Sequence, residues 1–483
     1  MTSLLWHDIV TAGVATLVLA VVLAVIGYVL LRVGAGRLVA RKVPHAACGV
    51  FAAVAAFQLS SFAAIVGVLT VATVALVFVV EKRTLPDILE GTRARDYGLV
   101  GFAAGALLAV VALWPDRIAV AAGLVVLGLA DAGAALVGHR FGRHRVAVSG
   151  ALRSLEGSAA FAVITFAVSL AFTVVGLNFD VPLAAAVSTF VALTTAFIEV
   201  LVPTAADNLL ITPWVALLLH LGRDLSSADA LRWLFAAIFA CGTVLLTARL
   251  RWLDLPGAIG GGWVAAVAIG LGGWVWLAPA ATFFALTSLL TAYRRTSRTE
   301  SLRGLSQVAV NGVLPVAVPV IGYALTRDQV WFAVYIGGVA ASIADSWASE
   351  IGRFSTKLPV SLRTRRRVPR GTSGAVSPLG FAATGLGGLG VGLAGALIGN
   401  PAIIVVGLVA GIAGSLLDSL LGAAVQGRFR CPSCCAAVED RSHCGVPGEL
   451  FSGYRWIDNN VVNAFANTTG MAVAFGVIEL VLP

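Results

Sequence analysis

The sequence predicts an all-α, polytopic integral membrane protein with roughly 14–16 transmembrane helices in two packed helical domains. Of its 483 residues, 59% are hydrophobic and 12% are charged, whereas soluble domains are about 45–50% apolar and about 25% charged. The mean hydropathy is +0.95. Apolar runs long enough to cross a bilayer recur along the whole sequence, so no soluble domain of useful size remains.

The first apolar run, Ile9 to Leu31, is too long for the core of a signal peptide. No Lys or Arg precedes it, and Arg32, Arg37, Arg41 and Lys42 follow it. Positive residues favour the cytosolic side of a membrane. The pattern predicts a retained first helix with its N-terminus outside and its C-terminal end in the cytosol.

Further apolar segments, bounded by polar, Gly-rich or Pro-containing connections, predict the remaining helices. The expected helices are 8–31, 46–58, 61–80, 97–113, 117–138, 155–176, 181–199, 208–221, 229–248, 254–271, 273–290, 305–325, 330–346, 375–398, 402–425 and 461–482. Threading these spans from an outside N-terminus places nearly all basic loops in the cytosol. Arg223 is an exception, because it falls in an outside connection. The net charge of +9 therefore indicates membrane topology and not nucleic-acid binding.

A polar boundary near residue 225 divides the chain into two domains of similar size. Residues 1–225 form the first and residues 226–483 the second, which carries a Cys-rich cytosolic loop at 426–460. No soluble linker separates them, so both are expected to lie within the membrane.

The first domain contains "GLADAGAALVGHRFGRHR" (128–145), in which Gly128, Asp131, Ala135 and Gly138 share one helix face. Small neighbours would let a polyphosphate and its metal approach the Asp131 carboxylate. A small-residue packing stripe between membrane helices would explain the glycines but not the aspartate. Because an acid inside a membrane is costly, the pattern predicts a catalytic or Mg²⁺-binding role for Asp131.

Two further stretches of the first domain carry polar side chains near helix starts. "SGALRSLEGSAAF" (149–161) offers Arg153, Glu156 and Ser158 at a helix start. Arg153, Ser158 and the free N–H groups there suit phosphate oxygens, and Glu156 is a candidate catalytic residue, although "SLEG" also fits a helix cap. "IEVLVPTAADNLLITP" (198–213) offers Asp207 and Asn208 together with Glu199, and Asp207 alternatively fits a cap.

The second domain repeats an acid on a small-residue helix face, with Asp345 in "ASIADSWASEIGRF" (341–354) and Asp418 in "GIAGSLLDSLLGAAVQG" (411–427). Both are predicted to bind Mg²⁺ or nucleotide phosphate. Between them, "RRRVPRGTSGAVSPLG" (365–380) predicts an anion cradle. A basic loop that only sets topology would explain Arg365 and Arg366 but not "GTSG". The cradle residues are Arg367, Arg370, Gly371, Thr372, Ser373 and Gly374.

The loop sequence "CPSCCAAVEDRSHC" (431–444) contains four soft metal ligands within fourteen residues. Cys431, Cys434, His443 and Cys444 would suit a structural, tetrahedral Zn²⁺ site. Cys435 competes for the same role. The alternative is a reduced Cys-rich loop without a metal.

The first domain resembles the phytol kinase and dolichol kinase family of CTP-dependent polyprenol kinases. The resemblance covers roughly residues 30 to 220 and rests on "RKVPH" (41–45), "DAGAALVGHRFGRH" (131–144), "SLEGS" (154–158) and "IEVLVPTAADNL" (198–209). It implies nucleotide contacts by Lys42 and by the polar residues named above. Ala132, Ala135 and Arg153 depart from the Gly, acid and Lys usual in that family.

The second domain resembles the phytyl-phosphate kinase family, through "RGLSQVAVNG" (303–312), "DSWASEIG" (345–352), "RVPRGTSGAVSPLG" (367–380), "GSLLDSLLGA" (414–423) and "DNNVVNAFAN" (458–467). The resemblance covers about residues 260 to 482. The site residues that it implies are Gln307, Asn311, Asp345, Glu350, Arg367, Thr372, Asp418, Asn459, Asn460 and Asn463. Asn459 and Asn463 are expected to share one helix face.

Together the two resemblances imply a bifunctional membrane kinase. It would phosphorylate an isoprenoid alcohol of the phytol, geranylgeraniol or farnesol type to the monophosphate and then to the diphosphate. The expected co-substrate is a nucleoside triphosphate such as CTP, with Mg²⁺, at sites that face the cytosol in the plasma membrane. The alternatives are a CDP-lipid-type cytidylyltransferase and a secondary transporter, whose acids should lie near the bilayer midplane.

Overall fold

The computed structural model describes residues 2–82, 97–148, 151–202, 206–294, 302–370, 372, 374–397 and 400–481. Within these residues, thirteen helices are long and apolar enough to cross a membrane. Three shorter apolar helices, Gly98–Leu113, Asp207–Gly222 and Trp274–Leu290, accompany them. The prediction of an all-α, polytopic membrane protein is confirmed.

The chain folds into two compact units, Met1–Ala237 and Ile238–Pro483, called here the N-terminal and C-terminal units. Their boundary lies inside the helix Ser227–Arg249, whereas the sequence places it in the polar connection near residue 225. A polar connection marks the end of one helix, but the division between packed units depends on which helices contact each other.

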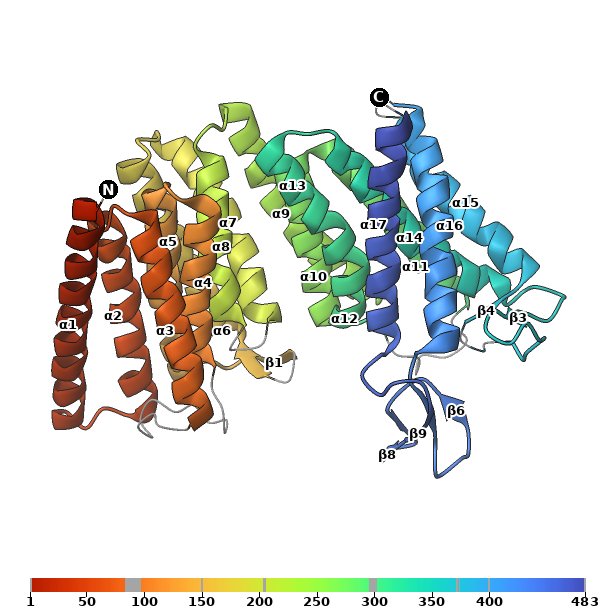
Figure 1. Cartoon of the computed structure of the whole chain (residues 1–483), viewed down its shortest axis with the longest axis horizontal. Helices are drawn as coiled ribbons and strands as arrows, with labels where there is room; N and C mark the ends of the chain where they lie inside the picture. The colour runs from red at the N-terminus through yellow and green to blue at the C-terminus, as the bar shows by residue number, and fades with distance from the viewer. Residues whose placement is uncertain are drawn as a thin grey trace. The chain divides into compact units, whose positions relative to one another are not determined.

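The N-terminal unit is a helical bundle in which α5 packs against α2, α6 and α8. Much of α5 is fully buried, including Val120, Ala121 and Val126. Figure 1 shows the short hairpin containing β1 at one end of this bundle. Its elements are α1 (Thr2–Arg32), α2 (Arg37–Gln58), α3 (Phe62–Lys82), α4 (Gly98–Leu113), α5 (Arg117–Phe141), β1 (Arg145–Val148), β2 (Ala151–Ser154), α6 (Leu155–Ala171), π-helix η1 (Phe172–Gly176), α7 (Val181–Leu201), α8 (Asp207–Gly222) and the first part of α9 (Ser227–Arg249).

The C-terminal unit is organised around α14, which packs against α15, α16 and α17. Figure 1 shows β6, β8 and β9 beyond the ends of α16 and α17. Its elements are α10 (Leu255–Val267), η2 (Ala268–Gly272), α11 (Trp274–Arg294), α12 (Leu305–Val308), η3 (Ala309–Ala317), α13 (Val318–Thr326), α14 (Val330–Gly352), β3 (Val360–Ser361), β4 (Ala375–Val376), α15 (Pro378–Ala396), α16 (Ala402–Ala424), β5 (Arg428–Arg430), β6 (Ala437–Val438), β7 (Ser442–His443), β8 (Val446–Pro447), β9 (Glu449–Ser452) and α17 (Asn459–Val481).

Several expected helix limits and one expected loop differ from the structure, as α2, α14 and the segment after α5 illustrate. Helix α2 begins at Arg37 and contains Pro44, because its polar first turns extend beyond the apolar run from which the start at 46 was predicted. Similarly, α14 continues to Gly352. The loop expected at 139–154 contains the antiparallel β1–β2 hairpin, with Arg145 opposite Ser154.

The isolated Arg223 is explained by an ion pair at the N-terminal end of α5. Its guanidinium donates to both carboxylate oxygens of Asp116, with two N···O distances of 2.5 Å. His220 Nδ1 lies 2.8 Å from the same carboxylate. Burial raises the pKa of the Asp116 carboxyl, but hydrogen bonds from Arg223 and His220 outweigh this, so the pKa lies below its usual range. The Arg223 guanidinium therefore joins α8 to α5. This ion pair explains its presence in a connection where membrane topology alone does not favour an Arg.

We expect Asp116→Asn to lower the unfolding temperature of the purified full-length protein, because the bidentate ion pair is lost. The substituted amide can still accept the capping bond from Ala119 N, so the loss should be about 1–2 kcal/mol. A lowered carboxyl pKa stabilises the fold above the unfolded value, and this stability is lost as pH falls through the folded value. The two melting curves should therefore converge below about pH 4. Asp224→Asn, at an exposed neighbour, is the control, and equal stability of D116N and wild type at pH 7 would contradict the assignment.

Candidate functional site

In the N-terminal unit, Asp131 on α5 faces two basic side chains of α2. Lys42 Nζ lies 2.5 Å and His45 Nε2 3.4 Å from Asp131 Oδ2. All three side chains are largely buried, with 10–14% of their surface exposed. Because α2 starts at Arg37, Lys42 is held on a helix instead of a loop.

Glycine on both helices brings α2 this close to α5. A Cβ on Gly49 would lie 2.6 Å from Leu124 O and 2.8 Å from Gly128 Cα, closer than van der Waals contact allows. The packing interpretation is therefore right for Gly128. Next to Gly128, the backbone of α2 therefore fills the space in which a polyphosphate was expected to approach Asp131.

Arg153, at the end of β2, joins two buried carboxylates from different helices. It forms an ion pair with Glu199 of α7 and a 3.1 Å contact with Asp207 of α8. Its Nη2 also donates to Val202 O at 3.2 Å. Ser158 of α6 donates to the second oxygen of Glu199 at 3.2 Å. The predicted phosphate clamp thus has protein carboxylates as its partners in this structure.

These two groups form one charged cluster. Asp131 lies within electrostatic range of Arg153, Glu199 and Asp207. The α5 cluster, as we call it, consists of Lys42, His45, Asp131, Arg153, Ser158, Glu199 and Asp207. Its three carboxyl groups face two cations, Lys42 and Arg153, so one negative charge remains for a proton, His45 or a bound cation to compensate.

Two predicted residues of this unit lie outside the α5 cluster. Glu156 accepts hydrogen bonds from the backbone N–H of His144 at 3.2 Å and contacts its Nδ1 at 2.7 Å. Ser154 caps α6 by accepting from Gly157 N at 3.1 Å, so the capping interpretation explains "SLEG".

Asn208 donates to Gly98 O at 2.9 Å, which joins α8 to α4. Asp207, in contrast, is not the N-cap of α8, which is Ala206.

In the C-terminal unit, Asp345 of α14 and Asp418 of α16 face each other. Their carboxyl groups lie close enough to interact strongly with each other. Asp418 Oδ2 is buried and accepts no hydrogen bond from the described residues. Within the same residues, no Lys, Arg or His pairs with either carboxyl. This acid pair therefore lacks the protein cations that accompany Asp131.

Glu439, which the sequence analysis did not single out, lies within electrostatic range of both members of the acid pair. Its Oε2 accepts a hydrogen bond of 3.1 Å from Gln426, a residue with 3% of its surface exposed. Glu439 belongs to the Cys-rich loop. The sequence offered no signal for this role, because ordinary solvated loops also contain acids.

Asparagines connect three elements beside the acid pair. The side chain of Asn467 on α17 accepts from Ser342 at 2.8 Å and donates to Asn311 at 3.0 Å. Asn463 and Asn467 are both buried, whereas Asn459 is exposed. Asn463 and Asn467 thus lie on the inward face of α17. Asn459 is the first residue of this helix and is exposed. Of the other predicted residues, Asn460 and Glu350 are half-buried and Gln307 is exposed.

The predicted anion cradle is docked against α16. A Cβ on Gly374, whose φ is +70°, would lie 2.2 Å from Ala423 N, so only glycine fits there. Thr372 donates to Pro369 O at 2.8 Å. Arg367 and Arg370 are exposed, and Arg370 donates to Thr356 O at 3.3 Å. Gly371 and Ser373 lie outside the described residues.

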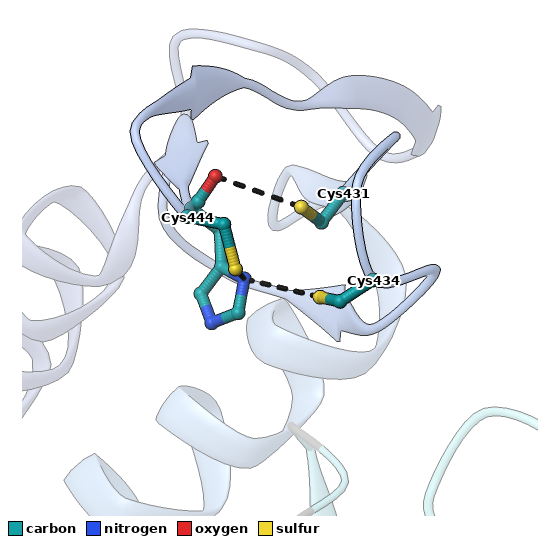
Figure 2. Close-up of side chains that lie close together, drawn as sticks. Cys431, Cys434 and Cys444 are labelled. Carbon is teal, nitrogen blue, oxygen red and sulfur yellow. Dashed lines mark hydrogen bonds between the residues drawn. The ribbon is translucent and has the colours of Figure 1, made fainter.

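The four predicted zinc ligands converge. The ligand atoms of Cys431, Cys434, His443 and Cys444 all lie within 4.8 Å of one another, and Figure 2 shows the three cysteine side chains directed toward one point. In the described part of the chain, no other group of three or more His, Cys, Asp or Glu side chains is gathered this closely. The residues predicted to bind Mg²⁺ (Asp131, Asp345 and Asp418) belong to no such group among the described residues.

We expect Arg153→Met to destabilise the full-length protein by about 3–5 kcal/mol, because Glu199 and Asp207 would remain buried without their cation. Arg153→Lys should cost less, since it keeps the charge but loses the planar fork. Thermal unfolding in detergent measures both.

Adding Glu199→Gln and Asp207→Asn to Arg153→Met should restore part of the stability, because the unpaired charges are removed. Arg140→Met, on the exposed end of α5, is the matched control. If Arg153→Met melts at the wild-type temperature, the ion pairs do not hold α7 and α8 to β2.

Comparison with known proteins identifies the family of the chain. Residues 238–471 match a family described as "Integral membrane protein DUF92". An uncharacterized membrane protein of Methanocaldococcus jannaschii is 30% identical over 207 residues, which cover 41% of this chain and 86% of that protein. Protein PGR of Arabidopsis thaliana is 27% identical over 276 residues, or 50% of this chain and 93% of that protein. No solved structure matches. The chain belongs to the DUF92 family of integral membrane proteins.

Proposed function

We propose that this protein is a bifunctional membrane kinase for isoprenoids. The N-terminal unit phosphorylates an isoprenoid alcohol, and the C-terminal unit phosphorylates the resulting monophosphate, with CTP or another nucleoside triphosphate as donor. The observation that carries the proposal is the acid pair of Asp345 and Asp418. Two facing carboxyls that no cation of the described residues accompanies are suited to hold a metal–phosphate complex.

In each step, an acceptor oxygen forms a bond to the γ-phosphorus of the nucleotide. The bond from that phosphorus to the β–γ bridging oxygen breaks, and the nucleoside diphosphate leaves with the electron pair. In the first step the proton of the alcohol passes to solvent. The protein acts on such a reaction mainly by positioning and by neutralising charge.

The side chains fit this division of labour. Asp345 and Asp418 would hold Mg²⁺, which, when bound, neutralises charge on the phosphates. The Arg367–Gly374 loop is docked through Gly374 beside Ala423 and Ser419 of α16, one turn beyond Asp418. Exposed Arg367 and Arg370 are available to phosphates from the aqueous side. In the N-terminal unit, Lys42 supplies the corresponding cation, and Asp131 holds it in place.

The location of the polar groups matches an amphiphilic substrate. Asp345 lies seven residues before the end of α14 and Asp418 six before the end of α16, or about 9–11 Å along each axis. An isoprenoid chain would remain among the apolar helices while its polar end reaches these residues. Carrying both activities on one chain would raise the local concentration of the monophosphate for the second step.

Asp131 lies deeper than the sequence predicted, because α5 continues to Phe141. Ten residues separate Asp131 from that end, or about 15 Å. A deep acid is also the feature that a secondary transporter would need. Transport is therefore the second candidate, and a CDP-lipid-type cytidylyltransferase remains the alternative that uses similar groups.

Single substitutions should separate the two kinase steps. We expect Asp131→Asn to lower phosphorylation of the free alcohol by at least about 100-fold while supplied monophosphate is still converted to diphosphate. Asp418→Asn should do the reverse, and Arg367→Lys should act like it but more mildly. The measurement uses purified protein with labelled nucleotide and phytol, farnesol or geranylgeraniol, and resolves products by mass. Asp180→Asn, at an exposed position, is the control.

The products also separate the alternatives. Diphosphate release with a CDP-lipid product would identify a cytidylyltransferase. If neither the alcohol nor the monophosphate is modified, and vesicles containing the protein take up substrate, the transporter would replace the kinase. Loss of both steps in Asp131→Asn would show that the units share one site and would contradict the assignment of separate steps.

We propose that both sites face the cytosol of the plasma membrane, and labelling of intact cells tests this. Single cysteines introduced at exposed Ala147, beside the α5 cluster, and at Asp180, at the other end of α6, should react differently with a membrane-impermeant reagent. Asp180→Cys should be labelled from outside and Ala147→Cys only after cell lysis. Labelling of Ala147→Cys in intact cells would contradict the proposed orientation.

A further inference from the structure

The connection from α16 to α17 folds into a small module in which Phe429, Cys431 and Ile457 are the buried side chains. Residues 428–457, which we call the Cys–His module, contain a three-stranded sheet in the order β6–β5–β9 and the two-stranded β7–β8 hairpin. From 431 to 450, all of which the structure describes, Cys431 alone is buried. So short a segment buries too little apolar surface to hold its shape, and such modules need a metal or a disulfide.

Two tight turns present the four ligand side chains. In the first, Cys435 N donates to Cys431 O at 2.9 Å, and Cys435 has a φ of +58°. In the second, Cys444 and Gly445, with φ of +53° and +76°, connect paired His443 and Val446. Left-handed conformations at residues other than glycine are strained. The strain is understandable if the turns must direct side chains toward a common ligand.

The distances between the ligand atoms are compatible with a tetrahedral metal site. His443 Nδ1 lies 3.4 Å from Cys434 Sγ and 3.3 Å from Cys444 Sγ. In a tetrahedral zinc site, with bonds of about 2.3 Å to sulfur and about 2.0 Å to nitrogen, these atoms would be about 3.5 Å apart. Three thiols and one imidazole form a Cys₃His set, which is typical of structural zinc. The cysteines form no disulfide.

The module is attached to the ends of both helices that it connects. Gly427 N donates to Ile457 O at 2.8 Å, and Tyr454 N donates to Val425 O at 3.0 Å. Arg428 donates to Gly422 O, the carbonyl of a residue in the last turn of α16, at 3.1 Å. A rigid module on this base fixes the position of residue 439, which lies between the two pairs of metal ligands.

We propose that Cys431, Cys434, His443 and Cys444 bind one structural Zn²⁺, and that this module thereby holds Glu439 beside the acid pair of Asp345 and Asp418. Glu439 is tied to Gln426 at 3.1 Å and adds a third negative charge near the two carboxyls. Zinc would thus act on the site through position and not through chemistry. The zinc half of the proposal is independent of the proposed function, and the Glu439 half rests on the metal proposed for the acid pair.

The zinc half is tested by elemental analysis of the full-length protein purified in detergent without chelators. We expect about one zinc per chain, retained in Cys435→Ser and lost in the Cys434→Ser, Cys444→Ser double variant. Cys435 is the matched control, because it lies in the same loop but is not one of the four converging ligands. Reconstitution with Co²⁺ should give the absorption bands of a tetrahedral cobalt–thiolate centre, and these should be absent from the double variant.

A protein that purifies without zinc and gives no cobalt–thiolate bands would overturn the zinc half. A thiol count of four instead of six under denaturing, non-reducing conditions would point to a disulfide in its place. Equal zinc content in Cys435→Ser and in the double variant would show that the metal is bound elsewhere on the chain.

The Glu439 half is tested with Mn²⁺ as the probe for the acid pair, measured by electron paramagnetic resonance on zinc-loaded protein. Glu439→Gln should keep its zinc but bind Mn²⁺ several-fold more weakly, because one negative charge is removed. Glu449→Gln, an exposed acid on β9, is the control. Unchanged Mn²⁺ affinity in Glu439→Gln would overturn the positioning role. Unchanged affinity in Asp418→Asn would instead count against the metal of the proposed function.

Discussion

Compensation of buried charge is the constraint on which both units depend. A carboxylate among apolar helices is stable only if a cation, a proton or several hydrogen-bond donors accompany it. The N-terminal unit supplies its own cations, since Lys42 contacts Asp131 and Arg153 joins Glu199 to Asp207. The C-terminal unit supplies none to its acid pair within the residues that the structure describes. The first site thus compensates most of its negative charge with its own cations, whereas the second does not do so within the described residues.

Close helix packing makes this arrangement of charges achievable. Gly49 against Gly128 brings α2 near enough for Lys42 to reach Asp131. In the C-terminal unit, a Cβ on Gly337 would lie 2.4 Å from Gly470 O, so α14 and α17 also approach through glycine. Small residues are the usual means of close approach between membrane helices. The glycines that the sequence presented as room for a ligand serve in part to position the charged side chains.

Much of the architecture could be predicted from the sequence, because long apolar runs leave few alternatives in a membrane. Asp131, Asp345 and Asp418 were conspicuous for the same reason. Their partners were not, since Arg153 meets Asp207 across 54 positions of sequence, and no local pattern encodes that contact. Glu439 and Asn467 were missed as well. In the sequence, Glu439 looks like any acid of a loop, because only the folded module brings it near the acid pair. Asn467 is one of several asparagines in its segment, and only the structure of α17 shows that it faces inward.

The C-terminal unit assembles its polar centre from elements that leave and re-enter the helical bundle. Asp345 and Asp418 come from helices, Gly374 places the arginine loop on α16, and Glu439 comes from the connection to α17. Loops of this kind cannot be held by apolar packing, because they lie where water competes for every contact. One loop is fixed by a glycine that fits closely against a helix, and the other contains four converging soft ligands. If the acid pair holds a metal–phosphate complex, as proposed, rigid attachment of the loops is as necessary as the two aspartates, because an acid pair without a fixed surround would bind a cation without orienting it.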